Sequence, residues 1–262
     1  MPLLKPEDLL GRLTLGELLF SNDHRVIAIK TILTSLVMLA LGGLFALTFR
    51  TELAAPGIQF LGARPYLGLL TAHGMIMVFG FLIPSVIGIC YYMLPGSLKT
   101  GRLHWAGTAQ ASYWTLALAA VLLIIGRPDF TWTVYAPMSL RVGGELVWMG
   151  YVAVALVGIS EFLAGLVLLR NVFAWKGRWS AMPLMGWGMA SEAALLLFST
   201  PLLFLVGLFL LTDWLGATAL FDPVRGGSTT TFLWIFWFYG LPAFYLLFMP
   251  AIAILYTLLP RF

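Results

Sequence analysis

The sequence predicts an all-α integral membrane protein, built as a bundle of six transmembrane helices. Of its 262 residues, 61% are hydrophobic and only 10% are charged, whereas soluble domains carry about 25% charged residues. Six apolar runs each supply the roughly 20 residues needed to cross a bilayer, and none alternates as an outer-membrane strand does. The composition excludes a soluble globular enzyme and a disordered chain, and a single cysteine, Cys90, excludes a disulfide framework.

The predicted helices follow one another with short connections. They cover residues 26–48, 67–95, 106–126, 143–170, 184–212 and 230–259, which together form one transmembrane domain over 26–262. The first run is too long for a signal-peptide core, so we expect it to remain in the mature protein. Residues 1–25 form a separate segment, in which Pro6-Glu7-Asp8 is a typical helix start before leucines at near-helical spacing. We expect a short helix lying on the membrane surface, with a loose leader as the alternative.

The distribution of lysine and arginine predicts which ends of the helices face the cytoplasm. If the N-terminus is inside, ten Lys and Arg residues fall in cytoplasmic segments and five on the opposite side. Cytoplasmic loops carry the excess of these residues, so both termini are expected to be cytoplasmic. No organellar transit peptide is visible, which favours a prokaryotic plasma (inner) membrane. The net charge of +4 therefore reflects basic residues that face the two sides of a lipid bilayer, and no nucleic-acid partner is expected.

Of the three histidines, His73 is the one inside a predicted transmembrane helix. An ionisable side chain is costly at that depth and usually has a partner or a function. Neutral imidazole is a common axial ligand of haem iron. His73 is therefore a candidate ligand of a metal or a haem, and a hydrogen-bonded core histidine is the alternative. His24 and His104 lie outside the predicted helices, and we expect both to be solvated.

Two carboxyl groups lie within predicted transmembrane helices. Glu161 and Glu192 are each eight or nine residues from the near end of their helix, which places them about 13 Å deep at the usual helical rise. Two carboxyls at one depth could share a proton or form part of a proton path from the cytoplasm. The alternative is that each is protonated and hydrogen-bonded to a neighbouring helix.

An ordered set of short motifs carries a family resemblance. Residues 49–57 are Phe-Arg-Thr-Glu-Leu-Ala-Ala-Pro-Gly, and 71–74 are Thr-Ala-His-Gly. Residues 132–139 are Trp-Thr-Val-Tyr-Ala-Pro-Met-Ser, and 236–240 are Phe-Trp-Phe-Tyr-Gly. From residue 23 to 262, this set resembles the N-terminal half, helices I–VI, of subunit I of the haem-copper oxygen reductases, the cytochrome c oxidase family.

The resemblance implies a site on one side of a low-spin haem. His73 matches the axial ligand of the haem iron, Arg50 the arginine that hydrogen-bonds the haem periphery, and Trp132 the tryptophan near the propionates. Tyr66 matches a tyrosine on the same helix as the ligand. Glu52 matches a glutamate at an outer-surface cation site.

The sequence departs from the family at the copper site. The family's sixth helix has His-Pro-Glu-Val-Tyr where this chain has Leu-Pro-Ala-Phe-Tyr at 241–245. Leu241 cannot bind a metal, Ala243 cannot carry a proton, and Tyr245 has no histidine to be joined to. We therefore expect no copper bound by this chain. The loop at 99–105 also lacks the family's Asp-x-x-Phe-Pro-Arg signature, which holds a proton-entry aspartate.

Three functional hypotheses follow. In the first, the chain is half of a split subunit I in an oxidoreductase complex of the respiratory chain, of the cytochrome c or quinol oxidase type and used in aerobic respiration. A second membrane chain would supply helices VII–XII and the other haem ligand, so this chain is not catalytic alone. In the second, it is a degenerate, haem-free structural subunit packed beside a complete subunit I. In the third, it is a quinone-binding or proton-conducting subunit that uses Glu161 and Glu192.

Overall fold

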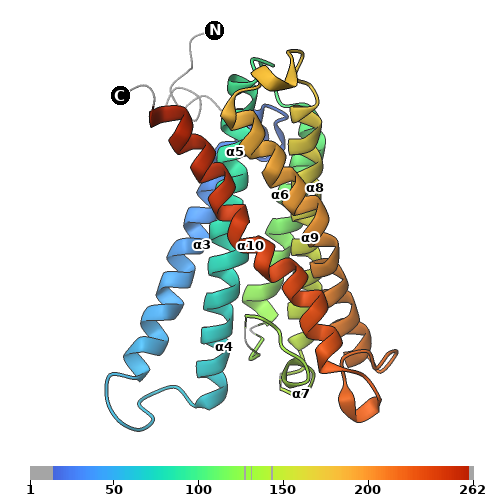
Figure 1. Ribbon diagram of the computed structural model, residues 1–262. Helices are drawn as coiled ribbons and strands as arrows, with labels where there is room; N and C mark the ends of the chain where they lie inside the picture. The colour runs from blue at the N-terminus through green and yellow to red at the C-terminus, as the bar shows by residue number, and fades with distance from the viewer. Residues whose placement is uncertain (1–13, 127, 131, 143, 260–262) are drawn as a thin grey trace.

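The computed structural model describes residues 14–126, 128–130, 132–142 and 144–259. These residues contain six helices long and apolar enough to cross a membrane, and no strand. The helices are α3 (His24–Glu52), the continuous helix Ala63–Ser97, α6 (Ala106–Gly126), α8 (Val147–Val172), α9 (Leu184–Trp214) and α10 (Thr229–Leu258). The predicted all-α fold of six transmembrane helices is confirmed. In Figure 1, α3 begins and α10 ends at the same end of the bundle.

The N-terminal segment ends in a short helix, α2 (Leu15–Phe20), which precedes α3. Thr14 caps α2 by a reciprocal exchange of hydrogen bonds with Glu17, which satisfies otherwise unpaired N–H groups. Residues 1–13 of the predicted surface segment lie outside the described residues. The first transmembrane helix begins at His24, two residues earlier than predicted, because Asp23 accepts a hydrogen bond of 2.9 Å from the backbone N–H of Arg25.

A buried lysine connects α2 to the bundle. Lys30 on α3 is 4% exposed, and its Nζ donates to the carbonyl of Leu19 at 2.7 Å and to Oε1 of Gln110 on α6 at 2.6 Å. The same ammonium lies 4.1 Å from the ring centroid of Tyr113. Two acceptors and an aromatic face stabilise the charge at this depth.

The second transmembrane helix consists of α4 (Ala63–Met75), a π-helical segment at Ile76–Leu82 and α5 (Ile83–Ser97). It runs beside α3 for most of its length (Figure 1). A Cβ added at Gly88 would lie 2.7 Å from a side-chain carbon of Ile32, so the two helices approach too closely there for a larger residue. Small residues commonly permit such packing between membrane helices.

The most extensive helix contact joins α8 and α9. At two places their backbones meet directly: a Cβ added at Gly158 would lie 2.6 Å from the backbone nitrogen of Phe204, and one at Gly207 would lie 2.5 Å from that of Ala155. Helix α10 then crosses the front of α9 and reaches α5 (Figure 1). This arrangement encloses the middle of the bundle, where the buried carboxyl groups lie.

Candidate functional site

His73 lies on α4 with its imidazole half-buried, and α3 fixes its orientation. Nδ1 is 2.8 Å from the carbonyl oxygen of Gly42 on α3. Because a carbonyl can only accept, Nδ1 must carry the hydrogen, and the lone pair of Nε2 remains available. Nε2 has no hydrogen-bond partner among the described residues. A backbone acceptor on one ring nitrogen is the usual way in which a protein orients a metal-binding histidine.

Phe49 joins two of the predicted site residues. Its ring is 5.6 Å from that of His73 and 5.9 Å from that of Tyr66, with an edge-on geometry in both cases. Phe49 follows Gly42 by seven residues, two helical turns, so both lie on the face of α3 that meets α4. Arg50 is exposed, and its guanidinium has no hydrogen-bond or ion-pair partner within the described part of the chain. Phe49 was not singled out in the sequence, although it stands next to Arg50 in the matching motif.

Trp132 reaches the same region from the loop that precedes α8. A Cβ added at Gly74 would lie 2.8 Å from Cβ of Trp132, so the residue after His73 is in direct contact with this loop. The ring of Trp132 also packs edge-on against Phe236 of α10, at 6.3 Å. The structure therefore places His73, Tyr66 and Trp132 around α4, with Phe49 between the first two.

These residues fit one side of a haem. They offer an oriented imidazole nitrogen, aromatic packing, and, one residue beyond Phe49, an exposed arginine suited to a haem carboxylate. No second histidine of the described ranges lies nearby, because His24 and His104 are at the opposite end of the bundle. Over the described ranges, no cluster of three or more His, Cys, Asp or Glu side chains could hold a metal ion.

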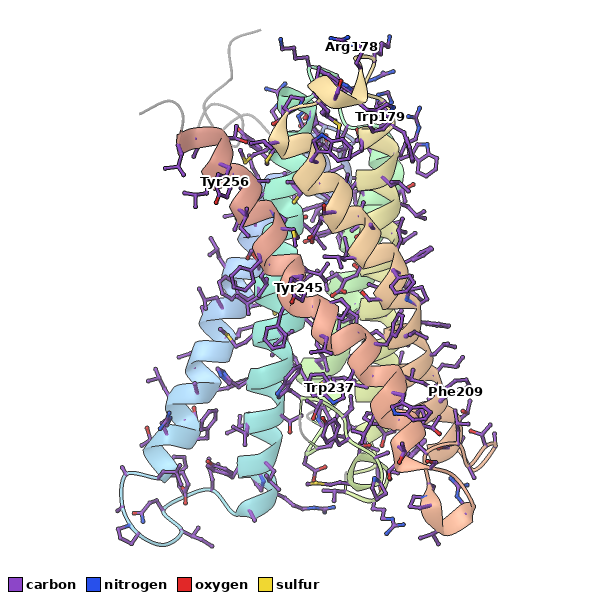
Figure 2. The ribbon with its side chains drawn as sticks, viewed as in Figure 1. Arg178, Trp179, Phe209, Trp237, Tyr245 and Tyr256 are labelled. Carbon is purple, nitrogen blue, oxygen red and sulfur yellow. The ribbon has the colours of Figure 1, made fainter. Side chains whose placement is uncertain are left out.

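Two of the three positions that match the family's copper site, Leu241 and Tyr245, face outward on α10. Leu241 is 60% exposed and Tyr245 is 55% exposed, while Ala243 is half-buried. Figure 2 shows Tyr245 on the front of the helix, directed away from the bundle. The face that carries these positions is therefore open to lipid or to another chain.

The two membrane-embedded carboxyl groups differ in their surroundings. Glu161 on α8 is 2% exposed, and the hydroxyl of Tyr239 on α10 donates to it, at 2.9 Å from Oε2 and 3.1 Å from Oε1. Glu192 on α9 is fully buried, and neither of its carboxyl oxygens has a hydrogen-bond partner in the described structure. The two carboxyl groups lie on α8 and α9, the pair of helices with the most extensive contact. Tyr239 could not be selected from sequence, because it stands in a run of aromatic residues typical of packing.

Two carboxylates at the C-terminal ends of transmembrane helices accept hydrogen bonds from backbone N–H groups of the loops that follow. Glu52, at the end of α3, accepts three N–H hydrogen bonds of 2.7 to 2.8 Å from residues 59–61. Asp213, near the end of α9, accepts N–H groups of Leu220 at 2.8 Å and Phe221 at 2.7 Å. A helix C-terminus disfavours an anion, and the N–H donors offset that cost. The cation-binding role implied for Glu52 stays a prediction.

The expectation that His24 and His104 are solvated stays a prediction, and both side chains line one pocket. Both are half-buried, because the loop between α5 and α6 folds against the first turn of α3. Burial, together with the positive charges of Arg170 and Arg102, lowers the pKa of His104. The free thiol of Cys90 is fully buried.

The fold and the oriented histidine define a multi-pass helical membrane protein with one side of a candidate haem site. Comparison with known proteins then gives the family: the one described as Cytochrome C and Quinol oxidase polypeptide I matches residues 26–262. The chain belongs to this family, and the resemblance noted in the sequence is confirmed.

Three relatives illustrate the extent of the match. The chain is 32% identical over 250 residues to cytochrome c oxidase subunit 1 of Synechocystis sp. and 32% identical over 249 residues to that of Thermostichus vulcanus. It is 30% identical over 255 residues to a heme-copper oxidase subunit I+III of Aeropyrum pernix. Each alignment covers 92% of this chain, but only 45%, 45% and 31% of the respective relative. The chain thus spans less than half the length of these relatives.

Proposed function

We propose that this chain forms one side of a low-spin haem site in a respiratory oxidase-type complex and serves electron transfer there. The observation that carries the proposal is the hydrogen bond of 2.8 Å between His73 Nδ1 and the Gly42 carbonyl, which leaves Nε2 free to bind iron. Haem, when bound, would supply the one-electron chemistry. The chain's own residues would hold it, exclude water from it and tune its potential through ligation, hydrogen bonding and burial.

Each neighbouring residue has a distinct role in this proposal. Phe49 packs against the edge of the imidazole and limits its rotation. Arg50, which has no partner in the described structure, would donate to a carboxylate at the haem periphery. Trp132 would cover the haem site next to Gly74. Tyr66, which packs against Phe49, would add a further aromatic ring to the same side.

The proposed partner is a second membrane chain that supplies the other axial ligand, as in a split subunit I. One histidine cannot ligate both faces of a haem iron. The outer face of α10 offers a large apolar surface to such a chain, with Phe244 at 55% and Phe248 at 59% exposure. Because Leu241 and Ala243 carry no ligand atoms in their side chains, we propose that this chain binds no copper.

The charge distribution supports a cytoplasmic location for both ends of the chain, in a prokaryotic plasma membrane. Among the described residues, the end where α3 begins and α10 ends carries seven Lys and Arg residues against two acidic ones. Figure 2 shows Arg178 at this end, beside Trp179. Positive residues are retained preferentially on the cytoplasmic side.

Purification of the tagged full chain in mild detergent tests this function. We expect a low-spin haem band in the reduced-minus-oxidised spectrum, and mass spectrometry should identify a co-purifying membrane chain with histidines in its helices. Recovery of the chain without haem, bound to a complete subunit I, would instead establish the structural role. The apolar, 60% exposed Leu241 at the copper-ligand position of α10 favours that second candidate.

We also propose that Glu161 and Glu192 form part of a proton path from the cytoplasmic side, with the Tyr239 hydroxyl on Glu161 as an additional member. The double variant Glu161→Gln, Glu192→Gln keeps the size and hydrogen-bonding capacity of protonated carboxyls but cannot release a proton. In the purified complex, we expect turnover and proton uptake to fall by roughly 100-fold, the lower end of what a positioned proton-transfer group contributes. Glu145→Gln, at an exposed position, is the control. Unchanged turnover and uptake in the double variant would exclude the path.

A further inference from the structure

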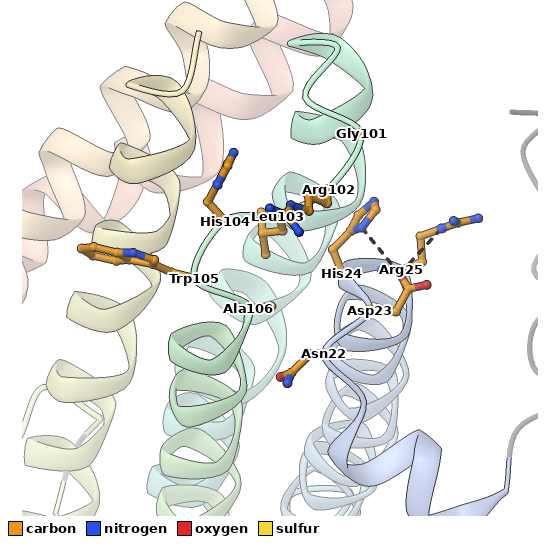
Figure 3. A pocket seen from close by; sticks show the side chains of 10 residues that line it. All are labelled: Asn22, Asp23, His24, Arg25, Gly101, Arg102, Leu103, His104, Trp105 and Ala106. Carbon is orange, nitrogen blue, oxygen red and sulfur yellow. Dashed lines mark hydrogen bonds and ion pairs between the residues drawn. The ribbon is translucent and has the colours of Figure 1, made fainter.

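A cavity of about 460 Å³ lies between the first turn of α3 and the loop from α5 to α6, at the basic end of the bundle. Its lining includes four basic side chains: Arg25, His24, Arg102 and His104. Figure 3 shows that the loop residues and the first residues of α3 approach from opposite walls, while Trp105 is directed away from them. None of these residues belongs to the proposed haem site.

The carboxylate in this lining is already engaged. Asp23 Oδ1 accepts the backbone N–H of Arg25 at 2.9 Å and lies 3.7 Å from Nε of the same arginine. It is also 3.5 Å from Nδ1 of His24. The negative charge of Asp23 is therefore already paired with the N-terminus of α3 and with the side chains of His24 and Arg25.

One positive charge of the cavity, that of Arg102, is unpaired within the described part of the chain. The Arg102 guanidinium is exposed and has no hydrogen-bond or ion-pair partner among the described residues. Burial first, and then the positive charges of Arg170 and Arg102, lower the pKa of His104, so these two arginines both act on its ring. The first residue of α6, Ala106, also borders the cavity, so the positive end of this long helix lies there, whereas the end of α3 is capped by Asp23.

We propose that this cavity binds a phosphate-type anion, the phosphodiester of an anionic lipid headgroup. Arginine side chains and helix N-termini are the groups that recognise phosphate oxygens. The position suits a lipid, because the cavity lies where two transmembrane helices begin, and Trp105, 52% exposed, flanks it as interfacial tryptophans do. Basic pockets between membrane helices bind such headgroups in other proteins.

Lipid titration of the purified full chain, with the chains that accompany it, tests the proposal. Short-chain phosphatidylglycerol is added in detergent and bound lipid is counted by native mass spectrometry, with phosphatidylcholine as the zwitterionic reference. We expect preferential binding of phosphatidylglycerol, and about fivefold weaker binding in Arg102→Gln, since each basic side chain contributes about that factor. Arg178→Gln is the matched control, because it removes a charge from the same end without touching the cavity.

A second titration with inorganic phosphate alone distinguishes the source of the anion. Competition by millimolar phosphate, without any preference for phosphatidylglycerol, would overturn the lipid assignment and identify free phosphate as the ligand. Equal binding of both lipids to the wild type without competition by phosphate, or an equal loss in Arg102→Gln and Arg178→Gln, would overturn the site itself. Arg25→Gln is a second cavity variant. Because it lies on α3, it tests the site even if Arg102→Gln alters the loop, and it should weaken binding to the same extent.

Discussion

Replacement of His73 by alanine is expected to abolish the low-spin haem band in the reduced-minus-oxidised spectrum of the purified complex. In the proposed site, Nε2 of His73 would ligate the iron from α4, and its orientation depends on the hydrogen bond to Gly42. Alanine removes the ligand and leaves the helix intact, since it is the best helix former. The loss should therefore be complete for that band, while the transmembrane helices remain assembled.

His104→Ala is the matched control for this experiment. It also removes an imidazole, but from the loop at the opposite end of the bundle, so the haem spectrum should be unchanged. Co-purification of the partner chain, measured in both variants, separates the loss of a ligand from the loss of assembly. An unaltered spectrum in His73→Ala would mean that this chain holds no haem iron.

Gly207→Ala is expected to lower the thermal stability of the protein strongly, although it adds a single methyl group. The new Cβ would lie 2.5 Å from the backbone nitrogen of Ala155 and 2.6 Å from the carbonyl oxygen of Tyr151. Both atoms belong to the backbone of α8, so the clash is relieved only if α8 and α9 separate. Overpacking of this kind costs about 1–3 kcal/mol and occasionally more. Thermal unfolding in detergent, monitored by light scattering, measures the effect.

Gly43→Ala is the matched control, for which no loss of thermal stability is expected. No atom lies within 4 Å of the position that its Cβ would occupy on α3. In a helix interior, alanine is favoured over glycine by about 1 kcal/mol, so stability should be unchanged or increased. If both variants unfolded at the wild-type temperature, the close contact between α8 and α9 would not be present in the protein.

The transmembrane helices were predictable because length and hydropathy determine them almost alone. The helix at 106–126 has the predicted bounds, and the others differ by a few residues at their ends, where capping groups such as Asp23 decide the boundary. The importance of His73 was also visible, because an ionisable side chain is rare within an apolar helix.

Other features depend on contacts that a sequence pattern does not contain. Tyr239 resembles its aromatic neighbours until α10 is placed against α8, where its hydroxyl meets Glu161. Gly42 carries no side chain that could be recognised, and only its carbonyl acts on His73. The basic cavity forms because the α5–α6 loop folds back on α3, a tertiary contact between segments that separately suggest solvated loops.

The π-helical segment at Ile76–Leu82 sets the rotational phase between two regions of one membrane span. A π turn holds one residue more than an α turn, so the helix beyond it is rotated by about 100°. Before the segment, His73 faces α3; after it, Cys90 is fully buried inside the bundle. Deleting one residue here would leave the span just as apolar, yet one of these two faces would turn away from its partners. The chain length of this stretch is therefore constrained independently of its hydrophobicity.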